Sequence, residues 1–313
     1  MLRLGLLGAR GHVGAELLRL VARHGGFSLD LATSSEAAGK RVGDVIDGAP
    51  FDVTFSRPDP DQAAARGLDV AVLALPNGES PQWVLAFQQR SPRTILLDLG
   101  ADHRFDPEWT YGQPERFRER LRGARRIANP GCYATAAQLA IDPLLGHLEG
   151  PVNVFGVSGY SGAGAAPSPR NDREALRDNV MPYALVGHAH ERELALHLGT
   201  PVYFMPHVAP FYRGVTVTVS FRLRAKATLA ELAAAYEERW GREPLVRLSK
   251  EAPLVRDAVG THAVHIGGLA VSADGLHAVV VATVDNLLGG AATQALRNLN
   301  LATGQHELLG IEP

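Results

Sequence analysis

The chain has 313 residues, a length that suits two domains better than one, and its 46% hydrophobic and 20% charged residues are ordinary for a globular protein. Its formal charge of −2 gives no reason to expect a polyanionic partner, and no apolar run reaches the roughly 20 residues that span a bilayer. Neither nucleic acid nor membrane is therefore expected as a partner.

Three local features refine this view. The first apolar run, 4–7, is cut short by Gly8 and Arg10, so no signal peptide is expected. A single cysteine excludes an internal disulfide and fits a reducing cytoplasm. The basic residues within 120–126 lack interleaved aromatics, which favours a solvated face over a nucleic-acid site.

The first half of the chain alternates apolar strands with helices. Strands are expected at 3–8, 27–33, 70–75 and 94–99, and helices at 12–21, 60–66 and 80–90. Strands that are apolar on both faces are typical of a parallel sheet covered by helices. The pattern predicts an α/β Rossmann domain over residues 1–147.

After about residue 150, β-branched residues alternate with polar ones. Strands are expected at 152–158, 214–224, 262–269 and 276–284, with a helix at 229–240. This pattern predicts an α+β domain with a mixed or antiparallel sheet over residues 148–289. The last segment, 290–313, begins with a helix that we expect to pack back on the first domain.

A glycine-rich turn, Gly8-Ala-Arg-Gly11-His-Val-Gly14, joins the first strand to the first helix. In a dinucleotide site such glycines permit a tight turn, close approach of a pyrophosphate, and close helix–strand packing. The spacing differs from the usual GxGxxG, and a glycine-rich turn can also serve packing alone. Its place at the first strand–helix junction favours a dinucleotide, with contacts from Arg10, His12 and Val13 beside the glycines.

The end of the second strand bears on which dinucleotide binds. An NAD site usually has an acidic residue there for the ribose hydroxyl. Here Asp30 lies inside the strand, and the strand ends in Thr33-Ser34-Ser35 with Arg10 nearby in sequence. Hydroxyls and cations suit a 2′-phosphate, so NADP is expected.

The single cysteine lies where a helix is expected to begin. Asn129-Pro-Gly131 ends a strand, and the alanine-rich segment after Cys132 is helical in character. A helix N-terminus lowers a thiol pKa, and its N–H groups stabilise an oxyanion. These residues alone leave two interpretations open, a nucleophile and a small buried hydrophobe.

Residues 127–135 resemble the active-site signature of the N-acetyl-gamma-glutamyl-phosphate reductase family. The signature residues present are Ile127, Ala128, Pro130, Gly131, Cys132, Tyr133, Ala134, Thr135 and Pro143. The resemblance continues along the chain in 8–14, 75–78, 98–102, 156–164 and 285–288. It implies a fold of the semialdehyde dehydrogenase type and NADPH-dependent reduction of N-acetylglutamyl 5-phosphate in arginine biosynthesis, with Cys132 as the nucleophile.

The stretches that resemble the family also supply expected site residues: cofactor contacts from Pro76, Asn77, Gly162 and Asn286, and substrate contacts from Asn129, Ser158 and Ser161. The glycine- and serine-rich run 158–164 can present backbone N–H groups to an anion, although it also suits a flexible loop. The chain departs from the family at Gly100 and His103, where Ser and Phe are common. This departure leaves the acyl group less determined than the reaction type. A homo-oligomer, dimer or tetramer, is expected.

A thiol mechanism needs a proton shuttle. Gly187-His188-Ala-His190-Glu-Arg-Glu193 resembles the family's His-x-His-x-x-Glu stretch, whose first histidine is the acid/base, so His188 is preferred and His190 is second. Prolines are expected to fix a loop around His207, which remains an outside candidate. No further ligand set has metal-binding spacing, and no metal is expected.

The substrate's phosphate and carboxylate favour arginine ligands. Arg104 and Arg213 lie at expected loop positions, although either position also suits a surface residue. The rival functions are a related reductase of aspartyl phosphate or carrier-bound aminoadipyl phosphate, and a non-catalytic NADP sensor. Asn129-Pro130 before the cysteine counts against the carrier-dependent enzyme.

Overall fold

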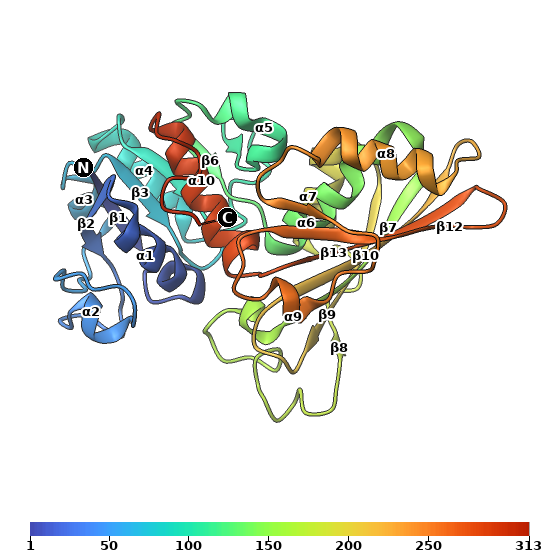
Figure 1. Ribbon diagram of the computed structural model, residues 1–313. Coiled ribbons are helices and arrows are strands. Elements are labelled where there is room, and N and C mark those ends of the chain that lie inside the picture. Colours follow the sequence, from blue (N-terminus) through green and yellow to red (C-terminus); the bar gives the residue numbers. More distant parts are fainter. Residues whose placement is uncertain (313) are drawn as a thin grey trace. The chain divides into compact units, whose positions relative to one another are not determined.

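The computed structural model describes residues 1–312, which form two compact units (Figure 1). One unit comprises residues 1–130 and 291–312, and the other comprises residues 131–290. The division falls at 130/131 rather than at the expected 147, because helix α6 (Cys132–Ile141) packs against strands of the second unit. The last helix, α10 (Thr293–Ala302), belongs to the first unit.

The first unit contains a parallel sheet of six strands in the order β2-β1-β3-β4-β6-β5. The strands are β1 (Leu2–Leu7), β2 (Phe27–Ala32), β3 (Val70–Leu73), β4 (Ile95–Asp98), β5 (Thr110–Tyr111) and β6 (Arg126–Ala128). The helices are α1 (His12–His24), α2 (Val42–Val45), α3 (Pro60–Ala64), α4 (Ser80–Arg90), α5 (Pro114–Leu121) and α10. All of β3 and most of β1 are buried, which confirms the predicted α/β class.

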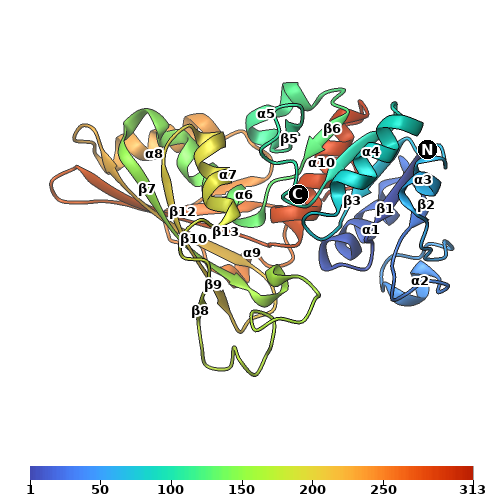
Figure 2. The same ribbon diagram turned by 180° about the vertical axis from the view of Figure 1, so that it is seen from behind.

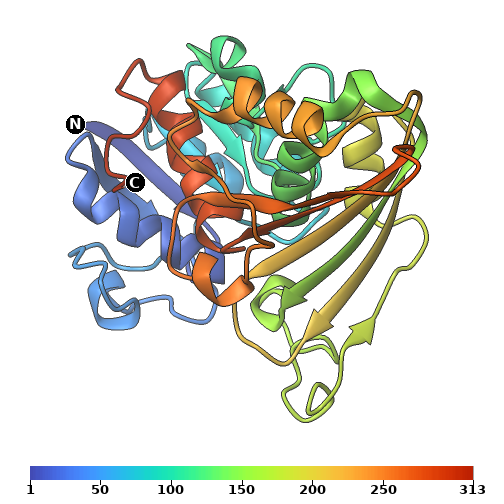
Figure 3. The same ribbon diagram turned by 45° about the vertical axis from the view of Figure 1, so that its right-hand side comes forward.

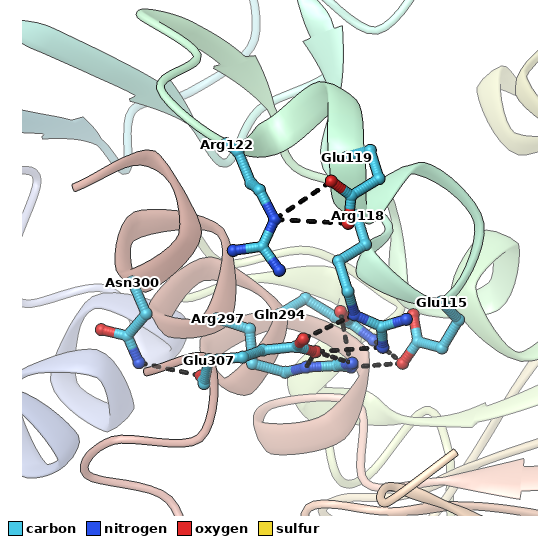
Figure 4. Close-up of polar contacts among 8 residues, drawn as sticks. All are labelled: Glu115, Arg118, Glu119, Arg122, Gln294, Arg297, Asn300 and Glu307. Atoms are coloured by element: carbon cyan, nitrogen blue, oxygen red, sulfur yellow. Dashed lines mark hydrogen bonds and ion pairs between the residues drawn. The ribbon is translucent and has the colours of Figure 1, made fainter. Parts of the chain in front are cut away.

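Helix α10 is buried on all sides although it carries many polar side chains. Arg297 has no exposed surface, and its guanidinium pairs with Glu115 from α5 and, at 2.6 Å, with Glu307 near the chain end (Figure 4). Arg118 reaches the same Glu307 at 2.6 Å. These ion pairs hold the C-terminal segment and α5 on the first unit.

The basic residues within 120–126, which lead into β6, are paired within the chain or exposed. Arg122 pairs with Glu119 at 3.2 Å, as Figure 4 shows, and Arg126 pairs with Glu108 at 2.7 Å. Such exposed pairs contribute little to stability, which agrees with a solvated face.

The second unit contains a mixed sheet of seven strands in the order β11-β12-β13-β10-β7-β9-β8. The strands are β7 (Leu148–Gly159), β8 (Met181–Pro182), β9 (Val202–Ala209), β10 (Val215–Leu223), β11 (Val246–Leu248), β12 (Val264–Val271) and β13 (His277–Val284). The helices are α6, α7 (Ala189–Leu198), α8 (Leu229–Trp240) and α9 (Val255–Ala258). Pairs β7–β9 and β11–β12 are parallel and the other pairs are antiparallel, so the mixed sheet is confirmed.

Helices α6, α7 and α8 lie over one face of this sheet (Figures 2 and 3). The residues of β10 alternate accordingly, since Val215, Val217 and Val219 are buried in the core under the helices and Thr216 and Thr218 are only half-buried. On the outer face Phe155 and Tyr203 are 42% and 57% exposed.

Candidate functional site

The glycines of the first turn differ in what the fold requires of them. Gly8 has φ +82°, and a Cβ there would lie 2.1 Å from the Ala74 carbonyl oxygen. A Cβ on Gly14 would lie 2.8 Å from the Ala9 carbonyl oxygen. Gly11 has φ −58°, and its Cβ would meet only the Gly8 carbonyl oxygen, at 3.5 Å. Packing therefore requires Gly8 and Gly14 but leaves open space beside Gly11.

Helix α1 begins directly after Gly11, with no side-chain cap and no acidic residue in its first turn. This start, which includes His12 and Val13, has room for an anion beside Gly11, so the turn fits a dinucleotide pyrophosphate. Burial lowers the pKa of His12, an effect that the carboxylate of Glu16 partly opposes. The neutral ring that this favours adds no charge to the turn.

The end of β2 has the polar character that the sequence indicates. Asp30 is bound to Arg3 at 2.9 Å, so this carboxylate is engaged within the sheet. The Ser34 hydroxyl accepts a hydrogen bond from the Ala37 backbone at 3.2 Å, Ser35 follows it, and exposed Arg10 forms an ion pair with Glu36. The contacts of Ser34, Ser35 and Arg10 with a cofactor stay predictions.

The turns after β3 and β4 are joined to each other. Asn77, which follows Pro76, accepts a hydrogen bond from the Ala101 backbone at 3.1 Å through its side-chain oxygen. Asp98 is fully buried at the end of β4, where its carboxylate binds His103 Nδ1 at 2.7 Å and Ser80 Oγ at 3.1 Å. His103, which stands where the family often has Phe, therefore acts as an internal partner of Asp98.

Two residues expected to contact substrate are instead bonded inside the first unit. Arg104 is 8% exposed and donates to the carbonyls of Asn129, at 3.0 Å, and Leu99, at 3.2 Å. Asn129 is 1% exposed and accepts from Asn298 at 3.0 Å. Both side chains hold the turn that leads to Pro130, and their contact with substrate stays a prediction.

Cys132 is the first residue of α6, as predicted, and is partly exposed. The Gly131 N–H just before it donates to the buried carboxylate of Glu193 at 3.0 Å. A Cβ on Gly290 would lie 2.9 Å from Cys132 Cβ, so that glycine lets the chain pass close to the thiol-bearing residue. The fold thus presents Cys132 at a helix N-terminus, where a thiolate is favoured.

His188 is the N-cap of α7 and so lies before the helix, as expected. Its Nδ1 accepts a hydrogen bond from the His190 backbone at 3.1 Å, and the two imidazole rings are 4.8 Å apart. The His190 ring lies 5.7 Å from that of Tyr133, the residue after Cys132. The structure therefore places both predicted histidines in one cluster with the start of α6.

Two tyrosines for which the sequence predicted no role complete this cluster. Burial raises the pKa of Tyr133 well above its usual value and also raises that of Tyr183, and negative charge on Cys132 adds to both shifts. The Tyr183 ring is 5.6 Å from that of His188. Tyr133 follows the cysteine directly, which was a signal for it, but nothing local marks Tyr183 or the buried Glu193.

His207 lies in strand β9 and not in the expected loop, because β9 pairs with β7 through Pro206 and beyond. Its backbone carbonyl accepts from the Tyr133 hydroxyl at 2.7 Å, and its ring lies 4.6 Å from that of Phe155. His207 therefore supports the site through its backbone.

The serine-rich turn after β7 gathers several predicted residues. Ser161 accepts from Asn286 at 3.0 Å, and Asn286 accepts from the Gly214 backbone at 2.6 Å. A Cβ on Gly162 would lie 2.7 Å from the hydroxyl of Ser158. These four predicted residues therefore lie together, and their functional contacts stay predictions.

Arg213 forms an ion pair with Asp285, in which Nη2 donates a hydrogen bond at 2.9 Å and Nε lies 2.8 Å from the other carboxylate oxygen. Asp285 is fully buried and also accepts from the backbones of Gly260 and Leu287. Its carboxylate neutralises Arg213 and caps the segment that leads to Gly290. The expected loop-borne arginine is thus committed to an internal partner, and its binding of a substrate anion stays a prediction.

Comparison with known proteins follows the same division into units. The model of the semialdehyde dehydrogenase NAD-binding domain matches residues 3–124, and that of the semialdehyde dehydrogenase dimerisation domain matches residues 132–286. An N-acetyl-gamma-glutamyl-phosphate reductase of Xanthomonas campestris pv. campestris (strain B100) is 52% identical over 98% of both chains. The chain belongs to the N-acetyl-gamma-glutamyl-phosphate reductase family.

Another relative so named, from Stenotrophomonas maltophilia (strain R551-3), is 48% identical over 98% of this chain and 97% of its own. A crystal structure of aspartate semialdehyde dehydrogenase II from Vibrio cholerae has a TM-score of 0.78 at 19% identity, covering 98% of this chain and 99% of its own. This likeness shows the shared fold. The predicted family, fold class and oxidoreductase class are confirmed.

Residues 1–312 contain no group of three or more His, Cys, Asp or Glu side chains arranged to hold a metal. No helix among these residues is both long and apolar enough to cross a membrane.

Proposed function

We propose that the protein reduces N-acetyl-gamma-glutamyl phosphate to the corresponding semialdehyde and phosphate, with NADPH as the reductant, in arginine biosynthesis. The observation that carries the proposal is the position of Cys132 at the start of α6, in one cluster with His188 and His190. The names of relatives about half identical over nearly the whole chain support the acyl group.

In the proposed mechanism the Cys132 thiolate attacks the acyl carbonyl, and phosphate leaves to give a thioester. Backbone N–H groups at the start of α6 stabilise the oxyanion of the tetrahedral intermediate. This covalent route replaces reduction of a poor hydride acceptor by two easier steps. NADPH, when bound, supplies the hydride.

His188 is the proposed acid/base of this scheme, and the hydrogen bond at its Nδ1 decides which ring nitrogen carries the proton. Because its Nδ1 accepts a hydrogen bond from the His190 backbone, the neutral ring carries its proton on Nε2. Nε2–H is then the group that donates a hydrogen bond to the oxyanion of the tetrahedral intermediate and to that of the thiohemiacetal, whose anion collapses to the aldehyde by expelling the Cys132 thiolate. His190 orients His188 through its backbone.

The choice of NADP rests on the end of β2. Asp30 is bound to Arg3, while Ser34, Ser35 and Arg10 provide hydroxyls and a cation of the kind that bind a 2′-phosphate. In this proposal Arg10 exchanges its exposed ion pair with Glu36 for the phosphate.

We also propose a homo-oligomer, dimer or tetramer, formed through the outer face of the second sheet. The matching family model is described as a dimerisation domain, and exposed Phe155 and Tyr203 lie on that face. The replacements Phe155→Glu and Tyr203→Glu should each lower the mass measured by light scattering.

A reactive thiol nucleophile also suits the reducing cytoplasm, which is the proposed location.

The deciding experiment is phosphate-dependent reduction of NADP with N-acetylglutamate semialdehyde and aspartate semialdehyde compared side by side. Activity with the acetylated substrate, absent in Cys132→Ala, supports the proposal. His188→Asn should lower kcat by roughly 10²–10⁴-fold. Activity with aspartate semialdehyde alone would be consistent with the mechanism but would refute the proposed acyl group. No activity with either substrate, despite NADP binding, would refute the proposed reaction.

A further inference from the structure

Arg170 lies beside the catalytic cluster, on the loop between β7 and β8. Its guanidinium carbon is 4.9 Å from the centroid of the Tyr183 ring. Tyr183 in turn lies 5.6 Å, ring to ring, from His188. The loop therefore brings a cation to the tyrosine that contacts the proposed acid/base.

The loop around Arg170 is held by specific bonds. The Asn171 side chain donates to the carbonyls of Gly164 and Ala166, at 2.9 and 2.7 Å, and accepts from the Ser168 backbone at 2.8 Å. Tyr183 is anchored by its N–H to the Pro206 carbonyl at 3.2 Å, next to the short pairing of β8 with β9. Both partners of the cation–π contact are thus positioned by the fold.

The arginines that the sequence proposed for substrate anions already have internal partners. Arg104 donates to two backbone carbonyls, and Arg213 is paired with the buried Asp285. Within residues 1–312, Arg170 has no carboxylate partner, and its guanidinium rests on an aromatic face. A guanidinium held in this way still has N–H donors to offer an oxyanion.

The contributions to the pKa of Tyr183 agree with a position of Arg170 close to the Cys132 thiol. Burial makes the largest contribution to the raised pKa of Tyr183, negative charge on Cys132 raises it further, and Arg170 opposes the shift. Cys132 and Arg170 therefore both lie within electrostatic range of the Tyr183 ring.

We propose that Arg170 is a substrate-binding residue that receives an oxyanion of the acyl substrate, either its carboxylate or its phosphate, beside Cys132. This inference rests on the proposed function, since it assumes that the substrate is an anion that reaches this thiol. The Tyr183 ring holds the guanidinium in place, and the charge draws anionic reagents toward the nucleophile.

The first test reads the charge near the thiol without requiring turnover. Because Cys132 is the only cysteine, alkylation rates report on this one site. Iodoacetate is an anion and iodoacetamide is neutral, so the ratio of their rates measures the local positive charge. At low ionic strength, Arg170→Gln should lower this ratio by about 3- to 10-fold, and Arg170→Lys should retain most of it.

Arg173 provides the matched control, since it is exposed on the same loop. Arg173→Gln removes an equal charge nearby and should leave the ratio unchanged. An unchanged ratio in Arg170→Gln, or an equal fall in Arg173→Gln, overturns the proposal. Absence of turnover with every semialdehyde would refute the proposed function, while the alkylation ratio would still decide whether Arg170 places positive charge beside Cys132.

The second test identifies which oxyanion binds. In the phosphate-dependent oxidation of N-acetylglutamate semialdehyde, Arg170→Gln should raise the KM of one substrate about 10-fold or more, with the KM of NADP unchanged. A raised KM for the semialdehyde assigns the carboxylate, and a raised KM for inorganic phosphate assigns the phosphate. Unchanged KM values for both overturn the proposal.

Discussion

Replacing the glycines of the first turn one at a time separates packing from cofactor binding. Gly11 has φ −58° and ψ 156°, which alanine adopts without strain, and its Cβ would meet one atom at an ordinary 3.5 Å. Gly11→Ala should therefore leave the free energy of unfolding unchanged or raise it by about 0.4–1 kcal/mol, since alanine has fewer unfolded conformations. The same methyl should weaken NADP binding about 10-fold or more, because it occupies the space proposed for the pyrophosphate.

Gly8→Ala and Gly14→Ala should behave in the opposite way toward stability. At Gly8 a positive φ costs about 1–2 kcal/mol and is aggravated by the 2.1 Å approach to Ala74. At Gly14 the 2.8 Å approach to Ala9 corresponds to overpacking of about 1–3 kcal/mol. Both variants should unfold at lower urea concentration than the parent protein.

Urea unfolding and NADP titration by calorimetry measure the two effects. Gly146→Ala is a matched control, because a Cβ there meets nothing within 4 Å and the residue lies in the second unit. It should change neither stability nor affinity by much. Unaltered NADP affinity in Gly11→Ala would refute the reasoning that the open space beside Gly11 belongs to the cofactor.

Three other predictions concern buried contacts. Arg297→Met should destabilise the protein by about 3–5 kcal/mol in urea unfolding, because Glu115 is left as a buried charge. Adding Glu115→Gln should recover part of this loss, and no recovery would assign the cost to packing. Burial by itself would raise the pKa of Glu307, but the cations of Arg118 and Arg297 outweigh burial and lower this pKa. The resulting stability is complete above the unfolded pKa of about 4.3 and is lost as pH falls through the folded pKa. A urea-unfolding series across acid pH should therefore show a smaller loss of stability in Glu307→Gln than in the parent protein. Gly290→Ala should displace Cys132 and lower kcat with little change in NADP affinity, and a kcat equal to that of the parent would contradict the close approach.

The features that the sequence predicted are local ones. Apolar strands such as β1 and β3 are buried on both faces, so their composition reports the parallel sheet directly. Cys132 follows Pro-Gly and precedes an alanine-rich segment, and these neighbours determine where α6 begins. The same holds for His188, whose place before α7 depends on the residues beside it.

Local reasoning misplaced His207 and overlooked β5, β8 and β11. A proline beside His207 suggested a loop, yet β9 continues through it because the strand pairs with β7 along its length. The other missed strands, β5, β8 and β11, have two or three residues each, too few to show a period, and they form only by pairing with a longer neighbour.

The sequence by itself therefore determined the family, the class of fold, the nucleophile's place at a helix start and the pair of nearby histidines. Only the tertiary structure decided which polar side chains are committed to internal partners. Arg213 pairs with Asp285, which is 72 positions away in the sequence, and Asn129 pairs with Asn298, which is 169 positions away. A buried polar group must be paired, and its partner comes from whichever distant segment the fold brings beside it, which no local pattern records.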